Sequence, residues 1–369
     1  PITIDEVIND LLDDQESRRE VQRVGQIIPY GKHFIDNQDI EAVVSTLRSG
    51  WLTQGPAISA FERKIADYVG VRFAVAVSSA TAGLHIAYKA LGARPSRSVI
   101  TSPITFVSTA NAAVFCGATV RFSDVNSSTI NLDAKRLDEQ LELHDDIEIV
   151  APVLFGGAAD GIPEVCEIAR KHGKKIVEDA AHALGAYYKN GARVGSCAYS
   201  DCTVFSLHPV KSIAAGEGGV VTTNDENIYR SLLRLRSHGI NKHDDPYLET
   251  ENAYTDGILN PWYYEMQDVG YHYRVTDIQA SLALSQMSKL DLFLESRKNI
   301  VRRYQDWSAN LPYIDHAQAI SVDDSANHLF VAKINFSLMQ QNRNSLMREL
   351  KKRNIITQVH YIPVVMQPY

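Results

Sequence analysis

Apolar positions along the chain occur mainly in short continuous runs that alternate with longer amphipathic stretches. The run FAVAV at residues 73–77 is typical of a buried strand, and the small polar residues after it open a helical pattern. Repeated strand–helix–strand units predict an α/β fold with a largely parallel sheet covered by helices. The same alternation continues through residues 98–101, 105–115, 119–122, 148–153, 162–172 and 174–179.

Two further strands are expected at residues 202–207 and 219–223. Between them lies HPVKSIAAGEG, so Lys211 falls in the turn that joins two buried strands. Most lysines only solvate a surface. An amine whose pKa is lowered can instead condense with a carbonyl and act in covalent catalysis. From the turn alone, both interpretations stay open.

The pattern changes near residue 275. Residues 275–310 are polar on one face and nearly free of glycine and proline, which predicts one long helix that leaves the main lobe. After it, HLFVAKINF, SLMRELKKRN and ITQVHYIP predict a strand, a helix and a strand of a smaller α/β lobe. We expect an N-terminal extension at 1–27, a large domain at 28–275, and a linking helix with a small domain at 276–369.

Two segments fit this alternation poorly. Residues 1–26 begin with apolar side chains at helical spacing, which predicts either an amphipathic arm against a partner subunit or a frayed terminal helix. Residues 241–268 form a long aromatic and acidic insertion. Loops of this length are usually functional or mobile.

Composition and charge narrow the class of protein. Of the 369 residues 45% are hydrophobic, and 37 Lys plus Arg against 44 Asp plus Glu give a net charge of −7 without a basic block. This balance disfavours a nucleic-acid partner. No apolar run approaches the roughly 18 residues of a membrane span, and no leader opens the chain, so we expect a cytoplasmic protein. The four cysteines form no CxxC pair, which favours reduced thiols over a metal site or disulfides: Cys116, Cys166, Cys197 and Cys202.

Two segments offer polar groups at the expected sheet edge. Asp179 ends a strongly apolar strand, where parallel sheets gather ligand-binding groups, and its carboxylate can pair with a pyridinium nitrogen or simply cap a following helix. Residues 78–81, SSAT, offer hydroxyl and N–H groups at a helix start, which suits a phosphate. Helix capping alone also explains them.

Six segments in order resemble the DegT-type sugar-nucleotide aminotransferases, from about Ile28 to the end of the chain. They are GWLTQGP, AVAVSSATAGLH, TFVSTANA, VEDAAHALG, FSLHPVKSIAAGEGGVV and GYHYRVTDIQASLALSQ. The resemblance implies a fold-type I transferase, the aspartate-aminotransferase fold, with pyridoxal 5'-phosphate as cofactor. HPVK, RSHG, NHLF and QVHYIP are most similar to the transaminases of pseudaminic acid biosynthesis. Those enzymes aminate a UDP-linked 4-keto-6-deoxy-N-acetyl-hexosamine at C4.

The resemblance also implies roles for single residues. Lys211 is expected to form the Schiff base with the cofactor and to carry the proton, and Asp179 to pair with the pyridine nitrogen. Phe106 is expected to stack on the ring, although a core phenylalanine is the alternative. His182 is expected near the 3-hydroxyl, or is an ordinary buried histidine. The phosphate-binding residues are expected to be Ser206, Ser79, Ala80 and Thr81, and the substrate-binding residues Thr53, His208, His360 and Tyr361.

Partners follow from the same resemblance. Arg274 falls where some relatives place an asparagine that reaches the phosphate of the neighbouring subunit's site, so it is either a substituted contact or has another role. A homodimer with shared sites is implied, with glutamate as amino donor and a nucleotide sugar as acceptor. The aromatic residues of the 241–268 insertion either form a wall for the uracil or pack on the partner. Relatives continue beyond the position of Tyr369, so further residues of the small lobe are expected.

Other functions remain to be weighed. A dehydratase of this fold has histidine in place of the lysine, so Lys211 disfavours it. A non-catalytic sensor would lose Lys211 or Asp179, and a module that only binds nucleotide sugars has no reason to hold a lysine in this turn. Among enzymes, the alternative is an aminotransferase that acts at C3 or on a dTDP- or GDP-linked keto sugar.

Overall fold

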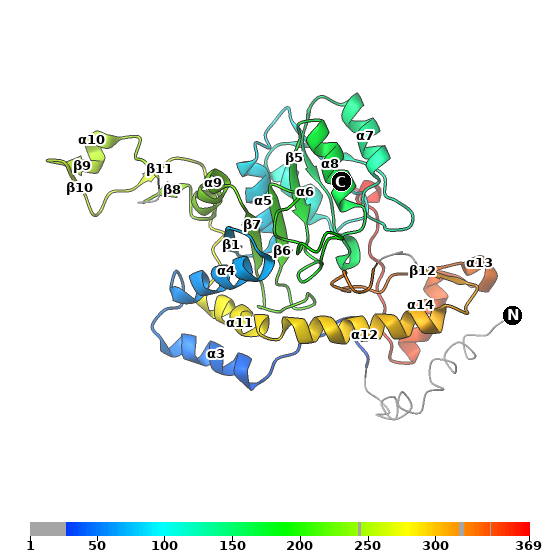
Figure 1. Cartoon of the computed structure of the whole chain (residues 1–369). Helices are drawn as coiled ribbons and strands as arrows, with labels where there is room; N and C mark the ends of the chain where they lie inside the picture. Colours follow the sequence, from blue (N-terminus) through cyan, green and yellow to red (C-terminus); the bar gives the residue numbers. More distant parts are fainter. Residues whose placement is uncertain (1–26, 243–244, 317–320, 340) are drawn as a thin grey trace.

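The computed structural model describes residues 27–242, 245–316, 321–339 and 341–369 (Figure 1). A seven-stranded sheet has the order β1-β7-β6-β5-β4-β2-β3, in which β7 alone runs antiparallel to its neighbours. The prediction of a largely parallel α/β sheet is therefore confirmed. The strands are β1 Phe73–Val77, β2 Ser98–Thr101, β3 Thr119–Phe122, β4 Ile147–Ala151, β5 Lys175–Asp179, β6 Cys202–Ser206 and β7 Gly219–Thr223.

Helices cover both faces of this sheet. Successive side chains of a strand point to opposite faces, so Ile176 and Val177 enter two different hydrophobic cores and both are fully buried. This arrangement explains the continuous apolar runs of the strands. One face is covered by α5 Ala80–Ala90, α6 Ser108–Phe115 and α9 Glu226–Arg236, and the other by α4 Pro56–Val69, α7 Ala134–Leu143 and α8 Ile162–Lys171.

The direction of β7 brings several segments to one edge. The parallel strands β4, β5 and β6 end at this edge, and β7 begins there. Residues 207–218 make the turn between β6 and β7, closed by a bond from the Leu207 N–H to the Gly218 carbonyl at 2.9 Å. The turn predicted around Lys211 is therefore present.

The long helix predicted at residues 275–310 is wrong in one respect, because two helices lie there. Helix α11 Asp277–Met287 ends before Ser288, and α12 Leu290–Ser308 begins after Lys289. The break turns Lys289 inward, where its Nζ lies 2.7 Å from Asp39 of α3 Asn37–Arg48. Helix α11 packs against α3 and α4. The helix is thus interrupted where Lys289 forms a buried ion pair with Asp39 of a distant segment.

The small lobe differs from the prediction at its last strand. A two-stranded antiparallel sheet, β12 Ile314–His316 and β13 Ala332–Ile334, is followed by α13 Phe336–Met339 and α14 Arg343–Lys352. ITQVHYIP, residues 356–363, forms no strand. The residue before it, Ile355, makes an isolated bridge with Ile28, and the Ile356 N–H donates to the Ile28 carbonyl at 3.0 Å. Beyond it the chain returns to the large lobe, where the Val364 N–H donates to the Pro103 carbonyl. The division into domains stays a prediction. The arm or frayed helix predicted at residues 1–26 lies outside the described residues.

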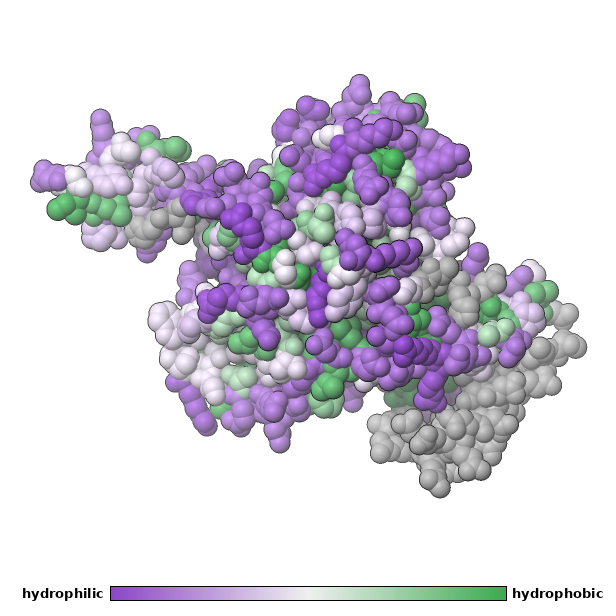
Figure 2. Space-filling view, viewed as in Figure 1, coloured by the Kyte–Doolittle hydropathy of each residue, from purple (hydrophilic) through white to green (hydrophobic). Residues whose placement is uncertain are grey.

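The insertion at residues 241–268 forms an arm that projects away from the sheet (Figure 1). It contains α10 Thr250–Ala253, a hairpin of β9 Tyr254–Thr255 with β10 Ile258–Leu259, and a pair of β8 Ile240–Asn241 with β11 Glu265–Met266. Figure 2 shows apolar residues on its outer end. Across the described ranges, no helix combines the length and apolar character needed to cross a membrane.

The Lys289–Asp39 pair supports a prediction about stability. Asp39 is fully buried and accepts hydrogen bonds from Ser285, Gln286 and Lys289. Replacing Asp39 with alanine should lower the free energy of unfolding by about 1–3 kcal/mol, because Ser285 and Gln286 lose a buried acceptor and the Lys289 ammonium keeps only Asp36, at 2.5 Å, as its partner. The exposed Glu41 of the same helix is the control, and Glu41→Ala should cost less than about 0.5 kcal/mol in the same denaturant titration. Equal losses in the two variants would contradict this account.

Candidate active site

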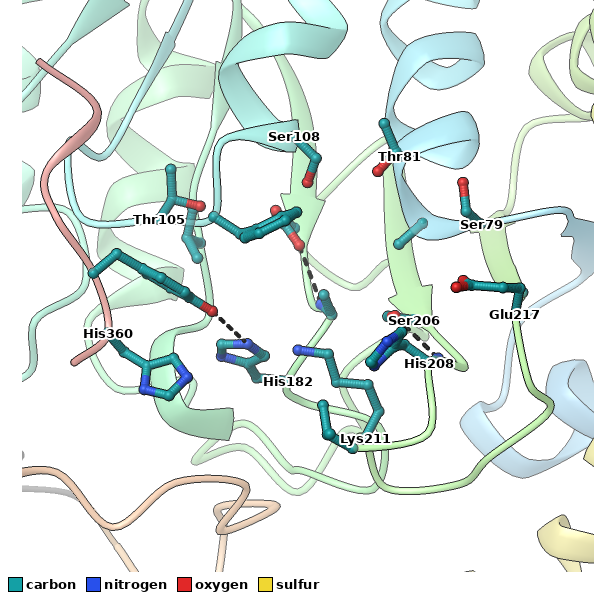
Figure 3. Close-up of a pocket in the computed structure, with 18 of the residues that line it drawn as sticks. Ser79, Thr81, Thr105, Ser108, His182, Ser206, His208, Lys211, Glu217 and His360 are labelled. Atoms are coloured by element: carbon teal, nitrogen blue, oxygen red, sulfur yellow. Dashed lines mark hydrogen bonds between the residues drawn. The ribbon is translucent and has the colours of Figure 1, made fainter. Parts of the chain in front are cut away.

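A cavity of about 530 Å³ lies at the sheet edge where β7 begins (Figure 3). It is lined from the start of α5, the segment before α6, the strand ends, the 207–218 turn and the C-terminal segment. The structure brings most of the residues predicted from the sequence together here. These are Lys211, Asp179, Phe106, His182, Ser206, Ser79, Ala80, Thr81, His208, His360 and Tyr361.

Lys211 extends from its turn into the cavity (Figure 3). Burial lowers the pKa of its amine to about 8, a shift that the charge of Asp179 opposes and that of Arg297 reinforces. Arg297 of α12 also donates to the backbone carbonyls of Lys211 and His328, at 3.4 and 3.3 Å. About a tenth of the amine is therefore unprotonated at pH 7, far more than in an ordinary lysine, as a nucleophile or general base requires.

Asp179 lies at the end of β5 with only 5% of its surface exposed. Its Oδ2 accepts from the Thr109 hydroxyl at 2.6 Å, and its Oδ1 accepts from the Ala181 N–H at 3.1 Å. Burial raises the pKa of Asp179, whereas these two hydrogen bonds and the charge of Lys211 lower it. The residues that follow form turns, so the interpretation of Asp179 as a helix cap is wrong.

His182 meets the C-terminal segment inside the cavity. Its Nε2 lies 3.4 Å from the hydroxyl of Tyr361, while its Nδ1 has no hydrogen-bond partner among the described residues. Burial, with the nearby charges of Lys211 and His360, holds the pKa of His182 well below its usual range. The His360 ring is held in turn by the Tyr30 hydroxyl at 2.8 Å. His182 is therefore a neutral imidazole with one nitrogen available to a ligand.

The start of α5 provides the predicted anion-binding groups. The Ser79 hydroxyl caps the helix by accepting from the Ala82 N–H at 3.1 Å, so the capping interpretation holds for this side chain. The N–H groups of Ala80 and Thr81 lie in the first turn, where a helix offers no acceptor of its own. Gly219 packs so closely that a Cβ would lie 2.6 Å from the Ala80 nitrogen. Only glycine fits there.

Phe106 and Ser206 complete the predicted cofactor set within the cavity. The Phe106 side chain is 57% exposed, so its interpretation as a core residue is wrong. Its ring lies 6.1 Å from that of Tyr361. Ser206 ends β6, and its hydroxyl accepts from the His208 N–H at 3.4 Å. An exposed aromatic ring and a hydroxyl therefore line the same cavity as Lys211 and Asp179.

Thr53 and Arg274 lie apart from this cavity. Arg274 borders a smaller hollow of about 210 Å³ with Gln54 and Arg236. Its Nε has no partner within the described chain, and burial together with the charge of Arg236 lowers its pKa. Thr53 forms an isolated bridge with Thr276. The roles expected for Thr53 and Arg274 stay predictions.

The cavity also contains residues that sequence reasoning missed. Thr105 and Ser108 flank Phe106 in TFVST, so their place in that segment was an available signal. Gln358 directly precedes the HYIP segment and offered a similar signal. Tyr30 lies far away in sequence, and no pattern points to it. Glu217 enters the lining from the glycine-rich end of the Lys211 turn.

These groups suit one cofactor. A lysine amine of lowered pKa, a buried carboxylate at a strand end, and free N–H groups at a helix start match the carbonyl, ring nitrogen and phosphate of pyridoxal phosphate. The free Nδ1 of His182 adds a polar atom with no internal partner. Fold and cavity together define a fold-type I, pyridoxal-phosphate-dependent transferase.

Comparison with known proteins agrees with this class. A model of the DegT/DnrJ/EryC1/StrS aminotransferase family matches residues 33–369. The spore coat polysaccharide biosynthesis protein SpsC of Bacillus subtilis is 37% identical over 350 residues, which are 95% of this chain and 87% of that protein. The UDP-4-amino-4,6-dideoxy-N-acetyl-β-L-altrosamine transaminase of Campylobacter jejuni is 35% identical over 338 residues, 91% of this chain and 84% of the relative. The chain belongs to the DegT/DnrJ/EryC1/StrS aminotransferase family.

Solved structures show the same architecture. PseC of Helicobacter pylori, an aminotransferase involved in pseudaminic acid biosynthesis, has a TM-score of 0.82 at 27% identity and covers 93% of this chain and 87% of its own. The sugar aminotransferase Spr1654 of Streptococcus pneumoniae, solved in its pyridoxal-phosphate form, has a TM-score of 0.80 at 28% identity, with coverage of 93% and 87%. The protein is therefore a pyridoxal-phosphate-dependent sugar aminotransferase, which confirms the resemblance found in the sequence.

The lowered pKa of Lys211 can be tested on the protein without cofactor. In competitive acetylation followed by peptide mass spectrometry, Lys211 should reach half its maximal reactivity near pH 8, whereas exposed lysines titrate near 10.4. Asp179→Asn should move this midpoint to lower pH, because the charge of Asp179 opposes the shift. If Lys211 instead reached half its reactivity at the same pH as the exposed lysines, the lowered pKa attributed to its burial would be wrong.

Proposed function

We propose that this enzyme transfers an amino group from glutamate to C4 of a UDP-linked 4-keto-6-deoxy-N-acetyl-hexosamine, in the biosynthesis of an amino sugar such as pseudaminic acid. The observation that carries the chemistry is the Lys211 amine, with a pKa near 8, beside the buried Asp179 in one cavity. The choice of sugar rests on the names of the Campylobacter jejuni transaminase and Helicobacter pylori PseC.

The cavity residues divide the work of holding the cofactor. Lys211 would bind its carbonyl carbon, and Asp179 would pair with its ring nitrogen. Phe106 would cover one face of the ring, and His182 would lie near its 3-hydroxyl. The N–H groups at the start of α5, with Thr81 and Ser206, would bind the phosphate. When bound, pyridoxal phosphate supplies an electron-withdrawing ring that stabilises negative charge at the carbon next to the transferred nitrogen.

Lys211 then acts as the base. With cofactor and amino donor bound, its Nζ would accept a proton from the donor carbon attached to the transferred nitrogen and return it to the cofactor carbon on the other side of that nitrogen, because the amine has a pKa of about 8. The neutral His182 does not compete for this proton, since burial strongly disfavours its charged form. His208, His360 and Tyr361 border the space above Lys211 and are proposed to bind the sugar. The sensor interpretation is disfavoured because both Lys211 and Asp179 face the cavity.

A homodimer and a cytoplasmic location complete the proposal. The projecting arm exposes large apolar residues. Among them, Ile258 is 73% exposed, Trp262 69% and Met266 66%. Such a patch favours contact with another protein surface. The cysteines Cys116 and Cys166 are free thiols, in keeping with a reducing compartment.

Sedimentation tests the proposed dimer. We expect the protein to sediment at twice the mass of its 41.0-kDa chain at micromolar concentration. Changing Ile258 and Trp262 together to serine should shift it toward the monomer, because both are exposed in the single chain. A wild-type protein that stays monomeric would contradict the shared site.

The proposed reaction can be followed by absorption and mass spectrometry. Glutamate should change the visible absorption of the bound cofactor, and the UDP-linked 4-keto sugar should restore it while gaining an amino group at C4. Lys211→Ala should lower turnover by about 10³-fold or more, because it removes the base. Lys189, whose side chain is 77% exposed, provides the matched control, and Lys189→Ala should retain turnover.

The acceptor is tested in the same assay. Offering dTDP- and GDP-linked 4-keto sugars and a 3-keto sugar beside the UDP-linked 4-keto substrate compares the alternatives directly. Higher kcat/KM with any of these would replace the proposed acceptor and leave the aminotransferase class unchanged. Wild-type turnover in Lys211→Ala would overturn the role of the lysine.

A further inference from the structure

Behind Asp179 lies a pair of buried hydroxyl groups. Thr109, in the first turn of α6, places its Oγ1 2.6 Å from Oδ2 of Asp179. The Oγ1 of Thr105 lies 2.8 Å from that of Thr109. Thr105 is 1% exposed and Thr109 is fully buried, so no solvent replaces these contacts. Both residues lie in the segment that carries Phe106.

The direction of these hydrogen bonds follows from the number of hydrogens. The Thr109 hydroxyl has one hydrogen and three acceptors within reach: Oδ2 of Asp179 at 2.6 Å, Oγ1 of Thr105 at 2.8 Å and the carbonyl of Phe106 at 3.2 Å. If it donated to Thr105 or Phe106, its lone pairs would face the carboxylate at 2.6 Å. The hydrogen therefore points to Asp179, and Thr105 donates to Thr109. The two hydroxyls form a chain directed at the carboxylate, which strengthens each bond.

The backbone around Thr109 is also fixed. The hydroxyl of the fully buried Tyr88 donates to the Thr109 carbonyl at 3.2 Å. On the other side, the Ala181 N–H holds Oδ1 of Asp179. The Thr109 hydroxyl of α6 and the Ala181 N–H of the turn after β5 thus each donate to one oxygen of the Asp179 carboxylate. The plane of the carboxylate is set before any ligand enters.

We propose that Thr109, supported by Thr105, is a positioning residue that orients the Asp179 carboxylate and keeps the shared proton on the ring nitrogen of pyridoxal phosphate. This inference rests on the proposed pairing of Asp179 with that nitrogen. A proton shared by a carboxylate and a pyridine nitrogen can be bound to the oxygen or to the nitrogen. A hydrogen bond donated to the carboxylate stabilises its charge and therefore favours the state in which the nitrogen carries the proton. The N–H bond is kept, and no O–H bond forms on Asp179.

The surroundings of Asp179 show why one hydroxyl matters. The titratable groups around it are Lys211, Tyr88, Tyr361 and His182. Burial raises the pKa of Asp179, and the Thr109 hydrogen bond is the largest of the effects that lower it, ahead of the Ala181 N–H and the charge of Lys211. Removing the Thr109 hydroxyl therefore leaves burial less opposed, and the carboxylate becomes more basic.

The test observes the ring nitrogen directly. Pyridoxal phosphate labelled with ¹⁵N in the ring is bound to the full-length protein at neutral pH, without amino donor or sugar. The ¹⁵N shift of wild type should be that of a protonated ring. Thr109→Val should move it toward the value of neutral pyridine, Thr109→Ser should restore it, and Thr105→Val should give a smaller change in the same direction. An unchanged shift in Thr109→Val would overturn the proposal.

A second measurement separates this role from packing. Thr109→Val should weaken cofactor binding by about tenfold or more, the usual effect of losing a hydrogen bond to a charged group. In the Asp179→Asn background the same change should have little effect, because the charge is gone. Equal losses in both backgrounds would reduce Thr109 to a packing residue. If Thr109→Val does not fold, Thr105→Val is measured instead, because it keeps the contact between Thr109 and Asp179 and removes only the hydrogen bond from Thr105. Its ¹⁵N shift and its cofactor affinity then decide.

The outcome is independent of the proposed sugar. Neither measurement contains an amino donor or acceptor, so an error in the substrate leaves the shift and the affinity unchanged. An unprotonated ring nitrogen in wild type would overturn both this inference and the proposed pairing of Asp179. A protonated ring that is insensitive to Thr109 would overturn the inference alone.

Discussion

The active cavity depends on the reversed direction of one strand. Because β7 runs opposite to β6, the chain must turn back within residues 207–218 and start again at the same edge of the sheet. That turn brings Lys211 over the end of β5 and brings Gly219 against the start of α5. A side chain at residue 219 would push α5 away, and the N–H groups of its first turn would leave the cavity. The catalytic amine and the anion-binding helix are therefore positioned by one backbone constraint.

Burial at this edge acts on the charged groups in opposite ways. It lowers the pKa of Lys211 and raises that of Asp179, so each group is driven toward its neutral form. The attraction between the two charges opposes both pKa shifts. The Thr109 hydroxyl also opposes the rise in the pKa of Asp179, but it has no effect on that of Lys211. His182 has no opposing charge and stays neutral. The result is a cavity in which the amine is available as a base while the carboxylate retains donors for its charge.

Much of the fold could be predicted because the strands are buried on both faces, which leaves continuous apolar runs in the sequence. The break between α11 and α12 could not, since Lys289 fits an ordinary helix until Asp39 approaches it from 250 residues away. The segment ITQVHYIP has a strand-like composition, but it pairs with no strand and instead lines the cavity with Gln358, His360 and Tyr361. Site residues with a motif around them were predictable. Tyr30 has no motif around it and was not predictable. Thr109 lies in TFVST, but its role was not predictable, because it arises from contact with Asp179, 70 residues away.

Two adjacent carboxylates show why geometry is needed to separate structure from function. Glu178 and Asp179 both end the same apolar strand and point to opposite faces of the sheet. Glu178 accepts from Tyr188, Ser200 and Thr203, at 2.6, 2.9 and 2.7 Å, so protein donors surround it. Asp179 has one donor on each oxygen and borders the cavity. A carboxylate has about four acceptor positions, and those left open on Asp179 face the cavity, where a ligand can use them. Glu178 is thus a structural group and Asp179 a binding group, although the sequence presents them alike.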